Sequence, residues 1–414
     1  MQTRNSKVEL MAPAGSFEAL MAAMQAGADS VYFGIEQLNM RAKSSINFTL
    51  EDLEEIARRT QEQGVRSYIT LNTIIYDHDL SLIKTIVNAA KNAGITAIIA
   101  SDQAVINYAF SVGMEVHIST QLNVTNIETV KFYSHFADTM VLSRELSLKQ
   151  VKIITDAIIK EDVKGPKGQL IEIEIFGHGA LCMAVSGKCY LSLHTHNSSA
   201  NRGACVQNCR RTYKVIDLED GHEMEIDNEY IMSPEDLNTI NILDQIVDAG
   251  VKVLKIEGRG RAADYVHTTI KCYREALDAI DDGTYSNEKI DDWMTRLSSV
   301  FNRGFWNGYY LGQKLGEWTD QSGSKATSKK VYVGKGVKYF PNIGVGEFKM
   351  EAGSFKVGDK LLITGPTTGV VETKATEIRV ELEPVEETKK GDNCSIPIKV
   401  KIRPSDKLYK IVSA

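Results

Sequence analysis

The hydrophobic positions of the chain form short apolar runs, and most runs are preceded by a helical stretch that ends near a glycine. In the first unit, the apolar run 8–12 is followed by Ser16, a favourable N-cap residue, and by apolar residues at helical spacing up to Gly27. The same punctuation returns at Gly64 and Gly94. Strands are predicted on this basis at 8–12, 30–34, 66–72, 96–100, 115–119, 139–143, 170–176 and 251–256.

Strands that alternate with helices indicate a parallel sheet. Eight such units within roughly 260 residues are typical of a TIM-type (β/α)8 barrel, which is the fold we predict. A doubly wound α/β sheet is the alternative. No Gly-x-Gly-x-x-Gly motif follows the first strand, and this disfavours the dinucleotide-binding form of that alternative.

Two segments depart from the repeating pattern. A long insertion, at about 177–250, separates the seventh and eighth strands, and an insertion of this length in a compact domain is usually functional. Within it, a helix is predicted to begin at Ser233 and Pro234, and a further helix is predicted over 265–281. From about 328 the chain changes to short β-type runs with turn signals, which predict a small all-β barrel. The expected domains are therefore 1–325 and 328–414.

The predicted barrel makes the strand ends important, because active sites of this fold form at the carboxyl-terminal tips of the strands. Those tips are polar in this chain. The candidate substrate-binding residues there and in nearby loops are Arg41, Asn72, Gln121, Arg144, Arg202, Lys255 and Arg259. The candidate catalytic residues are His117, His178 and Glu257. His117 also fits a core histidine, and Glu257 with Arg259 also fits a simple ion pair at a strand end.

Composition and charge narrow the function classes. The 414 residues suffice for one large core and a second domain. No run approaches the roughly 20 apolar residues of a membrane span. The first ten residues lack the apolar region of a signal peptide, so we expect a cytoplasmic protein. The net charge of −6 gives no general sign of nucleic-acid binding. A local basic segment, whose members are Lys399, Lys401, Arg403, Lys407 and Lys410, fits either a nucleic-acid contact or a solvated strand face.

Four of the six cysteines, Cys182, Cys189, Cys205 and Cys209, lie within the insertion. A reducing compartment disfavours disulfides between them and favours a metal site. Their spacing matches neither the Cys-x2-Cys pair of a zinc ribbon nor the common ferredoxin pattern. Four thiolates suit zinc or an iron–sulfur cluster, and the residues alone leave both open, together with no metal at all.

The cysteine-rich stretch also carries a resemblance. Glu174-x-Phe176-x-x-Gly179-Ala180-Leu181-Cys182, followed by Gly187-x-Cys189, resembles the signature of peptidase family U32, also called collagenase-like protease. The segments 12–15, 255–259 and 302–305 resemble its first unit, last strand and linker. The resemblance covers nearly the whole chain, and the domain at 328–414 is similar to the family's C-terminal domain.

The resemblance implies a four-iron four-sulfur cluster, because better-understood relatives are oxygen-independent hydroxylases that carry one. Its ligands here would be Cys182, Cys189, Cys205 and Cys209. Some relatives place their last ligand in a later Asp-Leu-Cys segment, where this chain has Asn238. The length and the C-terminal domain resemble most the branch that makes 5-hydroxyuridine at the tRNA wobble position, with prephenate as hydroxyl donor.

Three functions follow from this resemblance. The first is a tRNA hydroxylase whose partners are tRNA and prephenate, a dicarboxylate for which the strand-end arginines would be suitable partners. The second is a peptidase, although no Ser/His/Asp order or His-Glu-x-x-His motif is evident. The third is a non-catalytic iron–sulfur or RNA-binding factor. The oligomeric state does not follow from the sequence.

Overall fold

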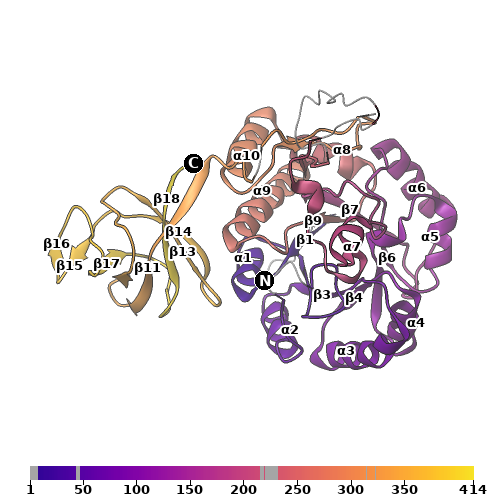
Figure 1. The fold of residues 1–414 in the computed structure, drawn as a ribbon, viewed down its shortest axis with the longest axis horizontal. Helices are drawn as coiled ribbons and strands as arrows, with labels where there is room; N and C mark the ends of the chain where they lie inside the picture. The colour runs from indigo at the N-terminus through magenta and orange to yellow at the C-terminus, as the bar shows by residue number, and fades with distance from the viewer. Residues whose placement is uncertain (1–7, 43–46, 215–218, 220–231, 314, 322) are drawn as a thin grey trace.

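A closed parallel barrel and an antiparallel sheet make up most of the computed structural model (Figure 1). The structure describes residues 8–42, 47–214, 219, 232–313, 315–321 and 323–414. Eight parallel strands of this part close the barrel, because β7 and β1 both pair with β9. They are β1 (Glu9–Pro13), β2 (Ser30–Phe33), β3 (Arg66–Leu71), β4 (Ala97–Ala100), β5 (Glu115–Ile118), β6 (Thr139–Val141), β7 (Glu172–Gly179) and β9 (Val253–Ile256). The predicted TIM-type barrel is confirmed.

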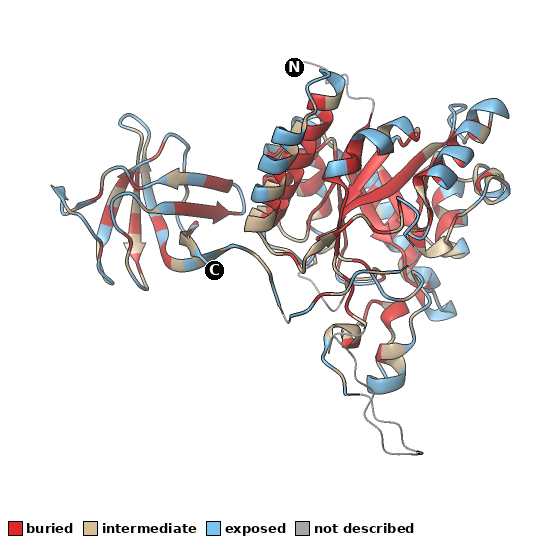
Figure 2. Ribbon diagram, turned by 90° about the horizontal axis from the view of Figure 1, so that it is seen from above, coloured by how far each residue is buried: buried red, intermediate tan, exposed pale blue. Residues whose placement is uncertain are grey.

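Helices surround the barrel, with their apolar faces turned towards the strands (Figure 1, Figure 2). They are α1 (Phe17–Gln25), α2 (Leu53–Glu62), α3 (Leu80–Ala93), α4 (Gln103–Ser111), α5 (Ile127–Tyr133), α6 (Leu148–Lys160), α8 (Leu243–Asp248), α9 (Ala263–Asp281) and α10 (Asn287–Ser299). The side chain of Ser16 accepts a hydrogen bond from the Ala19 amide and so caps α1. Gly94 ends α3 in the left-handed conformation, with φ of 82°, where a glycine carries no steric penalty.

The chain between β7 and β9 crosses the mouth of the barrel. Its described part contains α7 (Leu191–His196) and single 3₁₀ turns at Ala200–Arg202 and Asn208–Arg210. In Figure 1, α7 lies over the opening that the strands surround. The described residues of the predicted insertion at about 177–250 therefore include a helix that lies over the carboxyl-terminal ends of the strands.

One predicted helix is wrong. The segment after Pro234 is extended and forms β8 (Asp236–Asn238), and helix appears only later, in α8. The reason is that β7 continues past the barrel to Gly179 and leaves backbone groups that β8 satisfies in antiparallel pairing. The short strand β10 (Phe305–Trp306) then pairs with β8 in parallel.

The C-terminal region is an antiparallel sheet, as predicted for an all-β domain. Its described strands are β11 (Ser328–Phe340), β12 (Val345–Met350), β13 (Lys360–Gly365), β14 (Gly369–Lys374), β15 (Arg379–Val380), β16 (Glu383–Pro384), β17 (Asn393–Pro397) and β18 (Lys407–Ser413). They surround a core of their own, which includes the buried Phe348, Phe355 and Leu408.

This antiparallel domain contacts the outside of the barrel at α1 and α9 (Figure 1). Leu362 and Val370 pack against Ala22 and Ala263 in a small apolar cluster. Around that cluster, the Gln25 side chain donates to the Thr368 carbonyl at 2.8 Å and accepts from the Val370 amide at 2.9 Å. The domain is thus held at the barrel wall, on the outer side of α1.

The described helices include none that is both long and apolar enough to cross a lipid bilayer.

Candidate functional site

A cavity of about 680 Å³ opens at the carboxyl-terminal ends of the barrel strands, beneath the insertion. Its walls combine strand-end residues with residues of the cysteine-rich segment. The predicted residues that line it are Arg41, Asn72, Gln121, Arg144, Cys182, Cys189, Cys205, Cys209, Lys255, Glu257 and Arg259. The fold therefore brings most of the predicted site residues to one place, as the position of the strand ends requires.

Glu257, just beyond β9, is the centre of a charged cluster in the cavity wall. Its carboxylate accepts from Arg41 Nη2 at 2.7 Å and from the Tyr32 hydroxyl at 2.9 Å. Burial alone would raise the pKa of Glu257, but the cations Arg41, Arg259 and Arg144 outweigh it and hold the pKa at about 2. Glu257 is therefore an ionised acceptor at neutral pH.

Lys255 forms a second and deeper ion pair. Its Nζ lies 2.7 Å from Glu174 Oε1, and both side chains are almost fully buried. The ammonium also lies 4.5 Å from the centre of the Tyr32 ring, so an aromatic face offers it further stabilisation. The second oxygen of Glu174 is buried without a hydrogen-bond partner. The pair places one buried ammonium and one buried carboxylate at the floor of the cavity.

A row of uncharged polar groups follows the ends of β3 and β5. Asn72 Nδ2 donates to Ser119 Oγ at 3.2 Å and to Gln121 Oε1 at 3.3 Å, and the Ser119 hydroxyl donates to Gln121. Such a row can present hydrogen-bond donors and acceptors to a bound ligand without adding charge.

All four clustered cysteines face the same cavity and carry free thiols. Burial raises the pKa of the Cys209 thiol; Arg210 opposes the rise, and the charges of the other three cysteines add to it. Within the described residues, however, no three Cys, His, Asp or Glu side chains are arranged to hold a metal ion.

The cysteine set fits an iron–sulfur cluster by chemistry. Four soft thiolates are the donors that such clusters take. Binding at all four would require the thiols to approach more closely than they do here, and they lie on a segment of short turns and loops.

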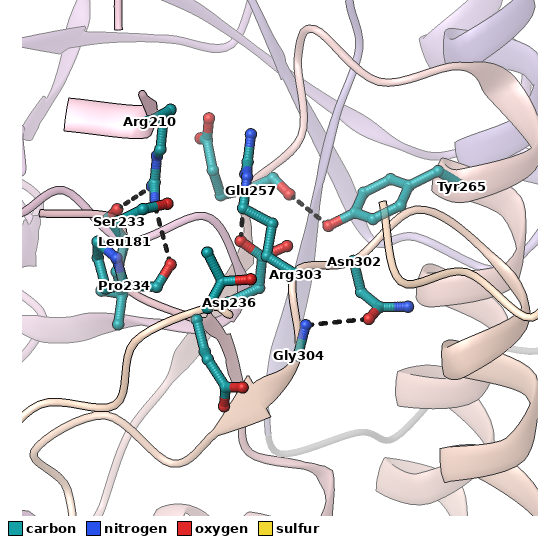
Figure 3. Close-up of polar contacts among 12 residues, drawn as sticks. Leu181, Arg210, Ser233, Pro234, Asp236, Glu257, Tyr265, Asn302, Arg303 and Gly304 are labelled. Carbon is teal, nitrogen blue, oxygen red and sulfur yellow. Dashed lines mark hydrogen bonds and ion pairs between the residues drawn. The ribbon is translucent and has the colours of Figure 1, made fainter. Parts of the chain in front are cut away.

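A network of arginines holds the cysteine segment against the barrel (Figure 3). Arg210 donates to the carbonyls of Pro234, at 2.8 Å, and Leu181, so it joins the chain before Cys182 to the chain before β8. Arg303 pairs with the buried Asp236 at 3.4 Å. Burial raises the pKa of the Asp236 carboxyl, and the arginines around it oppose the rise.

Three predicted residues do not line the cavity. His117 lies deeper in the barrel than Ser119, with its ring 4.6 Å from that of Tyr68 and its Nε2 3.3 Å from Glu115. Arg202 pairs with Asp79 at 2.5 Å, and its guanidinium lies over the Tyr76 ring. It therefore ties the insertion to the loop after β3.

His178 is the third of these residues. It is buried among the rings of Tyr265, Tyr273 and Phe305, on the outer side of the β7 end. Burial lowers the pKa of the imidazole to about 3, so it is neutral at physiological pH. The function proposed below gives neither His117 nor His178 a chemical role.

Sequence reasoning missed several residues that line or support the cavity, among them Tyr32, Phe176 and Glu174. Glu174 had a detectable signal. It lies in the alternating run Ile171 to Ile175, so its side chain must leave the apolar face of the strand and enter the barrel interior. Phe176 shares the motif Glu174-x-Phe176, which resembles the family signature. Tyr32 had no such signal, because an aromatic residue in an apolar strand fits core packing equally well.

The model of peptidase family U32 matches residues 15–320, nearly three quarters of the chain and including the whole cavity. The chain belongs to peptidase family U32. The match ends just before the antiparallel domain.

Relatives of this U32 protein carry different functional names. It is 59% identical over 402 residues to a protein named collagenase from Porphyromonas gingivalis, with 97% of each chain covered. It is 31% identical to tRNA hydroxylation protein P1 from Bacillus subtilis, over 91% of this chain and 89% of that one. It is 34% identical to 23S rRNA 5-hydroxycytidine C2501 synthase from Escherichia coli, over 68% of this chain and 41% of that one. The U32 family therefore includes proteins named for RNA hydroxylation as well as for proteolysis.

Proposed function

We propose that this U32 protein is an oxygen-independent tRNA hydroxylase. It would form 5-hydroxyuridine at the wobble position, with prephenate as hydroxyl donor and a four-iron four-sulfur cluster on Cys182, Cys189, Cys205 and Cys209. The observation that carries the proposal is the content of one cavity. Four free thiols and the cationic strand ends line the same space beneath the insertion.

The charge of the cavity supports an anionic substrate. Its described lining contains one carboxylate, Glu257, and the cations Arg41, Arg144, Lys188, Arg210, Lys255, Arg259, Arg261 and Arg303. The chain as a whole has a net charge of −6, so this concentration of positive charge is local. A dicarboxylate or an RNA phosphate entering the cavity would gain from it.

The chain's own residues have definable tasks in this proposal. Glu257, which accepts a hydrogen bond from the Tyr32 hydroxyl, fixes Arg41, and Glu174 fixes Lys255, so both cations are oriented before a ligand arrives. The described part of the insertion lines the cavity together with the strand ends. When bound, an iron–sulfur cluster would supply electron transfer at the cavity wall.

The test measures tRNA nucleosides by mass spectrometry in a host that lacks any other U32 protein. Deleting the gene should remove 5-hydroxyuridine and its derivatives, and the wild-type gene should restore them. Unchanged nucleosides after deletion would overturn the proposal. A loss of tRNA stability or level without a change in modification would instead favour a non-catalytic RNA-binding factor.

Peptidase activity is the second candidate, because the relative with 59% identity is named collagenase. The geometry gives it less support. In the cavity, the Ser119 hydroxyl is hydrogen-bonded to Gln121 and Asn72, and neither partner is a general base that could activate it. Collagen digestion by protein purified to remove host proteases tests this candidate. Cleavage that a single cavity substitution abolishes would establish it.

A further inference from the structure

Among the described arginines that line the cavity, Arg144 has the most buried donor atoms without a partner. Its Nε and Nη1 atoms are buried, and neither donates a hydrogen bond to any described residue. Arg41 is paired with Glu257, and Arg303 is paired with Asp236. Arg210 donates to two carbonyls. Arg259 leaves only Nε without a partner, because its Nη1 donates to Asn39 and Thr70. Arg261 lies over the Phe301 ring, and none of its nitrogens is both buried and unpartnered.

The backbone holds Arg144 firmly. The residue follows β6, and the amide of Leu142 donates to the Glu174 carbonyl at 3.0 Å. The next amide, Ser143, donates to the Val124 carbonyl at 2.9 Å. The guanidinium carbon of Arg144 lies over the Phe176 ring, 4.0 Å from its centre. Its unsatisfied donors thus belong to a fixed group and not to an exposed side chain that water could satisfy freely.

Stacking on Phe176 does not account for these donors. A cation–π contact stabilises the charge of a guanidinium, but it leaves the N–H groups without acceptors. A buried donor without an acceptor destabilises the protein, and more so when the donor is charged. Unpartnered buried donors are rare in folded proteins, so their presence in a cavity wall indicates that a bound ligand supplies the missing hydrogen-bond acceptor.

A second buried polar group without a hydrogen-bond partner lies at the end of the neighbouring strand. Thr120, two residues after the end of β5, also lines the cavity, and its hydroxyl is buried without a partner. Arg144 and Thr120 thus follow adjacent strands, since β5 pairs with β6. A charged donor and a neutral hydroxyl on adjacent strand ends are suited to an oxyanion with more than one acceptor oxygen.

We infer that Arg144 and Thr120 form an oxyanion subsite that binds a carboxylate of the small-molecule substrate in the cavity. Planar carboxylates accept two parallel hydrogen bonds from a guanidinium, which a lysine in the same place would not supply. The inference rests on the proposed function for the identity of the substrate as a carboxylate hydroxyl donor. An RNA phosphate shares the required chemistry, and the experiment separates the two sources.

The experiment measures binding to the full chain by isothermal titration calorimetry, with prephenate in one arm and uridine 5′-monophosphate in the other. Arg144→Gln should weaken prephenate binding at least tenfold, and Arg144→Lys should restore it only partly. Thr120→Val should weaken it severalfold. Arg58→Gln, which removes an exposed guanidinium on α2, is the matched control and should leave binding unchanged.

The stability of the ligand-free protein provides a second readout. Because Arg144 is unsatisfied without a ligand, Arg144→Gln should leave the melting temperature unchanged or raise it. A structural arginine would lower it. A fall in melting temperature together with unchanged prephenate and nucleotide binding would overturn the inference.

Each arm gives a distinct result. Weaker prephenate binding with unchanged nucleotide binding supports the carboxylate subsite. Weaker nucleotide binding alone would overturn the carboxylate assignment and give the site to a phosphate. Arg144-dependent prephenate binding in a protein that leaves tRNA unmodified would support the subsite and reject the proposed function. If the protein hydroxylates tRNA but binds prephenate equally well without Arg144, the proposed function would be supported and the subsite would be rejected.

Discussion

The barrel and the antiparallel domain are both built from strands, but they distribute polar side chains in different ways. All barrel strands run in parallel, so the residues at their carboxyl ends, such as Asn72, Arg144 and Glu257, meet at one mouth. Neighbouring strands of the antiparallel domain run in opposite directions, so their ends are divided between two edges. The comparison indicates that chemistry is concentrated in the barrel and that the C-terminal domain contributes surface.

The interiors show the same contrast. The barrel buries charged groups near its centre, including Glu174 and Lys255. The antiparallel domain encloses an apolar core around Phe348, Phe355 and Ile363, and its lysines are mostly exposed. Buried charges are costly to keep and are commonly retained for function, whereas exposed lysines are inexpensive.

The largest effect is expected from the cysteines of the cavity wall. Cys182→Ser or Cys209→Ser should reduce tRNA hydroxylation below detection and lower the iron content of protein purified without oxygen, because an alkoxide replaces a thiolate poorly in an iron–sulfur cluster. The measurements are nucleoside mass spectrometry and iron analysis. Cys272→Ala, at a buried position on α9 outside the cavity, is the matched control and should retain both. Full iron content in Cys209→Ser would exclude this residue as a ligand.

The second effect concerns the buried pair beneath the cavity. Lys255→Met should reduce the free energy of unfolding by about 3–5 kcal/mol, because it leaves Glu174 buried without its cation. Lys255→Met combined with Glu174→Leu should recover most of that loss. Denaturant unfolding of the three proteins provides the measurement. If the double variant is as unstable as the single one, the pair is not the source of the loss.

The strand pattern of the barrel was predictable, because the apolar runs were separated by helical stretches and a glycine followed most of those helices, as at Gly27, Gly64 and Gly94. The predicted strand at 66–72 is β3, and the one at 251–256 contains β9. The strand β8 was not predictable, because three residues beginning at Asp236 carry no alternation, and their pairing depends on the overhang of β7. Local patterns show which secondary structure a segment favours. They do not show where a strand distant in sequence has unpaired backbone groups with which that segment can pair.

The candidate site followed the same rule. Residues at strand ends, such as Gln121 and Arg259, reach the cavity because the topology brings all ends together. His178 was predicted as a site residue because it is close to Cys182 in the sequence. Proximity in sequence does not show on which side of the strand the imidazole lies. The pairing of β7 with β9 shifts register between Phe176 and His178, and the imidazole points into the aromatic cluster instead.

His178 therefore provides a smaller and pH-dependent effect. The unfolded chain takes up a proton on this imidazole near pH 6.5, whereas the folded protein does so only near pH 3. The unfolded state thus holds more protons between these values, and stability should fall as the pH decreases through this window, by up to about 1.4 kcal/mol per pH unit.

His178→Gln should remove that part of the slope, and urea unfolding at pH 7, 6 and 5 measures it above the range in which most carboxylates titrate. Burial also lowers the pKa of His267, but this residue is present in both proteins, so its contribution cancels. Equal slopes in the two proteins would show that His178 is solvated in the folded state.

The smallest effect is expected from the surface of the antiparallel domain. Residues 328–414 contain 16 Lys and Arg against 11 Asp and Glu, whereas the rest of the chain contains 32 against 43. On this domain Lys335 lies directly opposite Lys407 on β18 and opposite Lys349 on β12. Like charges directly opposed across strands are destabilising, so this row is suited to a polyanion that would neutralise it.

If the row contacts RNA, Lys335→Ala combined with Lys407→Ala should weaken tRNA binding by roughly threefold to tenfold at moderate salt. It should also reduce the slope of log affinity against log salt by about 2, since each lysine–phosphate contact contributes roughly 1. Fluorescence anisotropy with a labelled tRNA transcript is the measurement. Lys360→Ala combined with Lys374→Ala is the matched control, because these exposed lysines also oppose one another, at the far end of β13 from the row. An equal loss in the two variants would show that the domain attracts RNA through its net charge alone and that the row is no distinct contact.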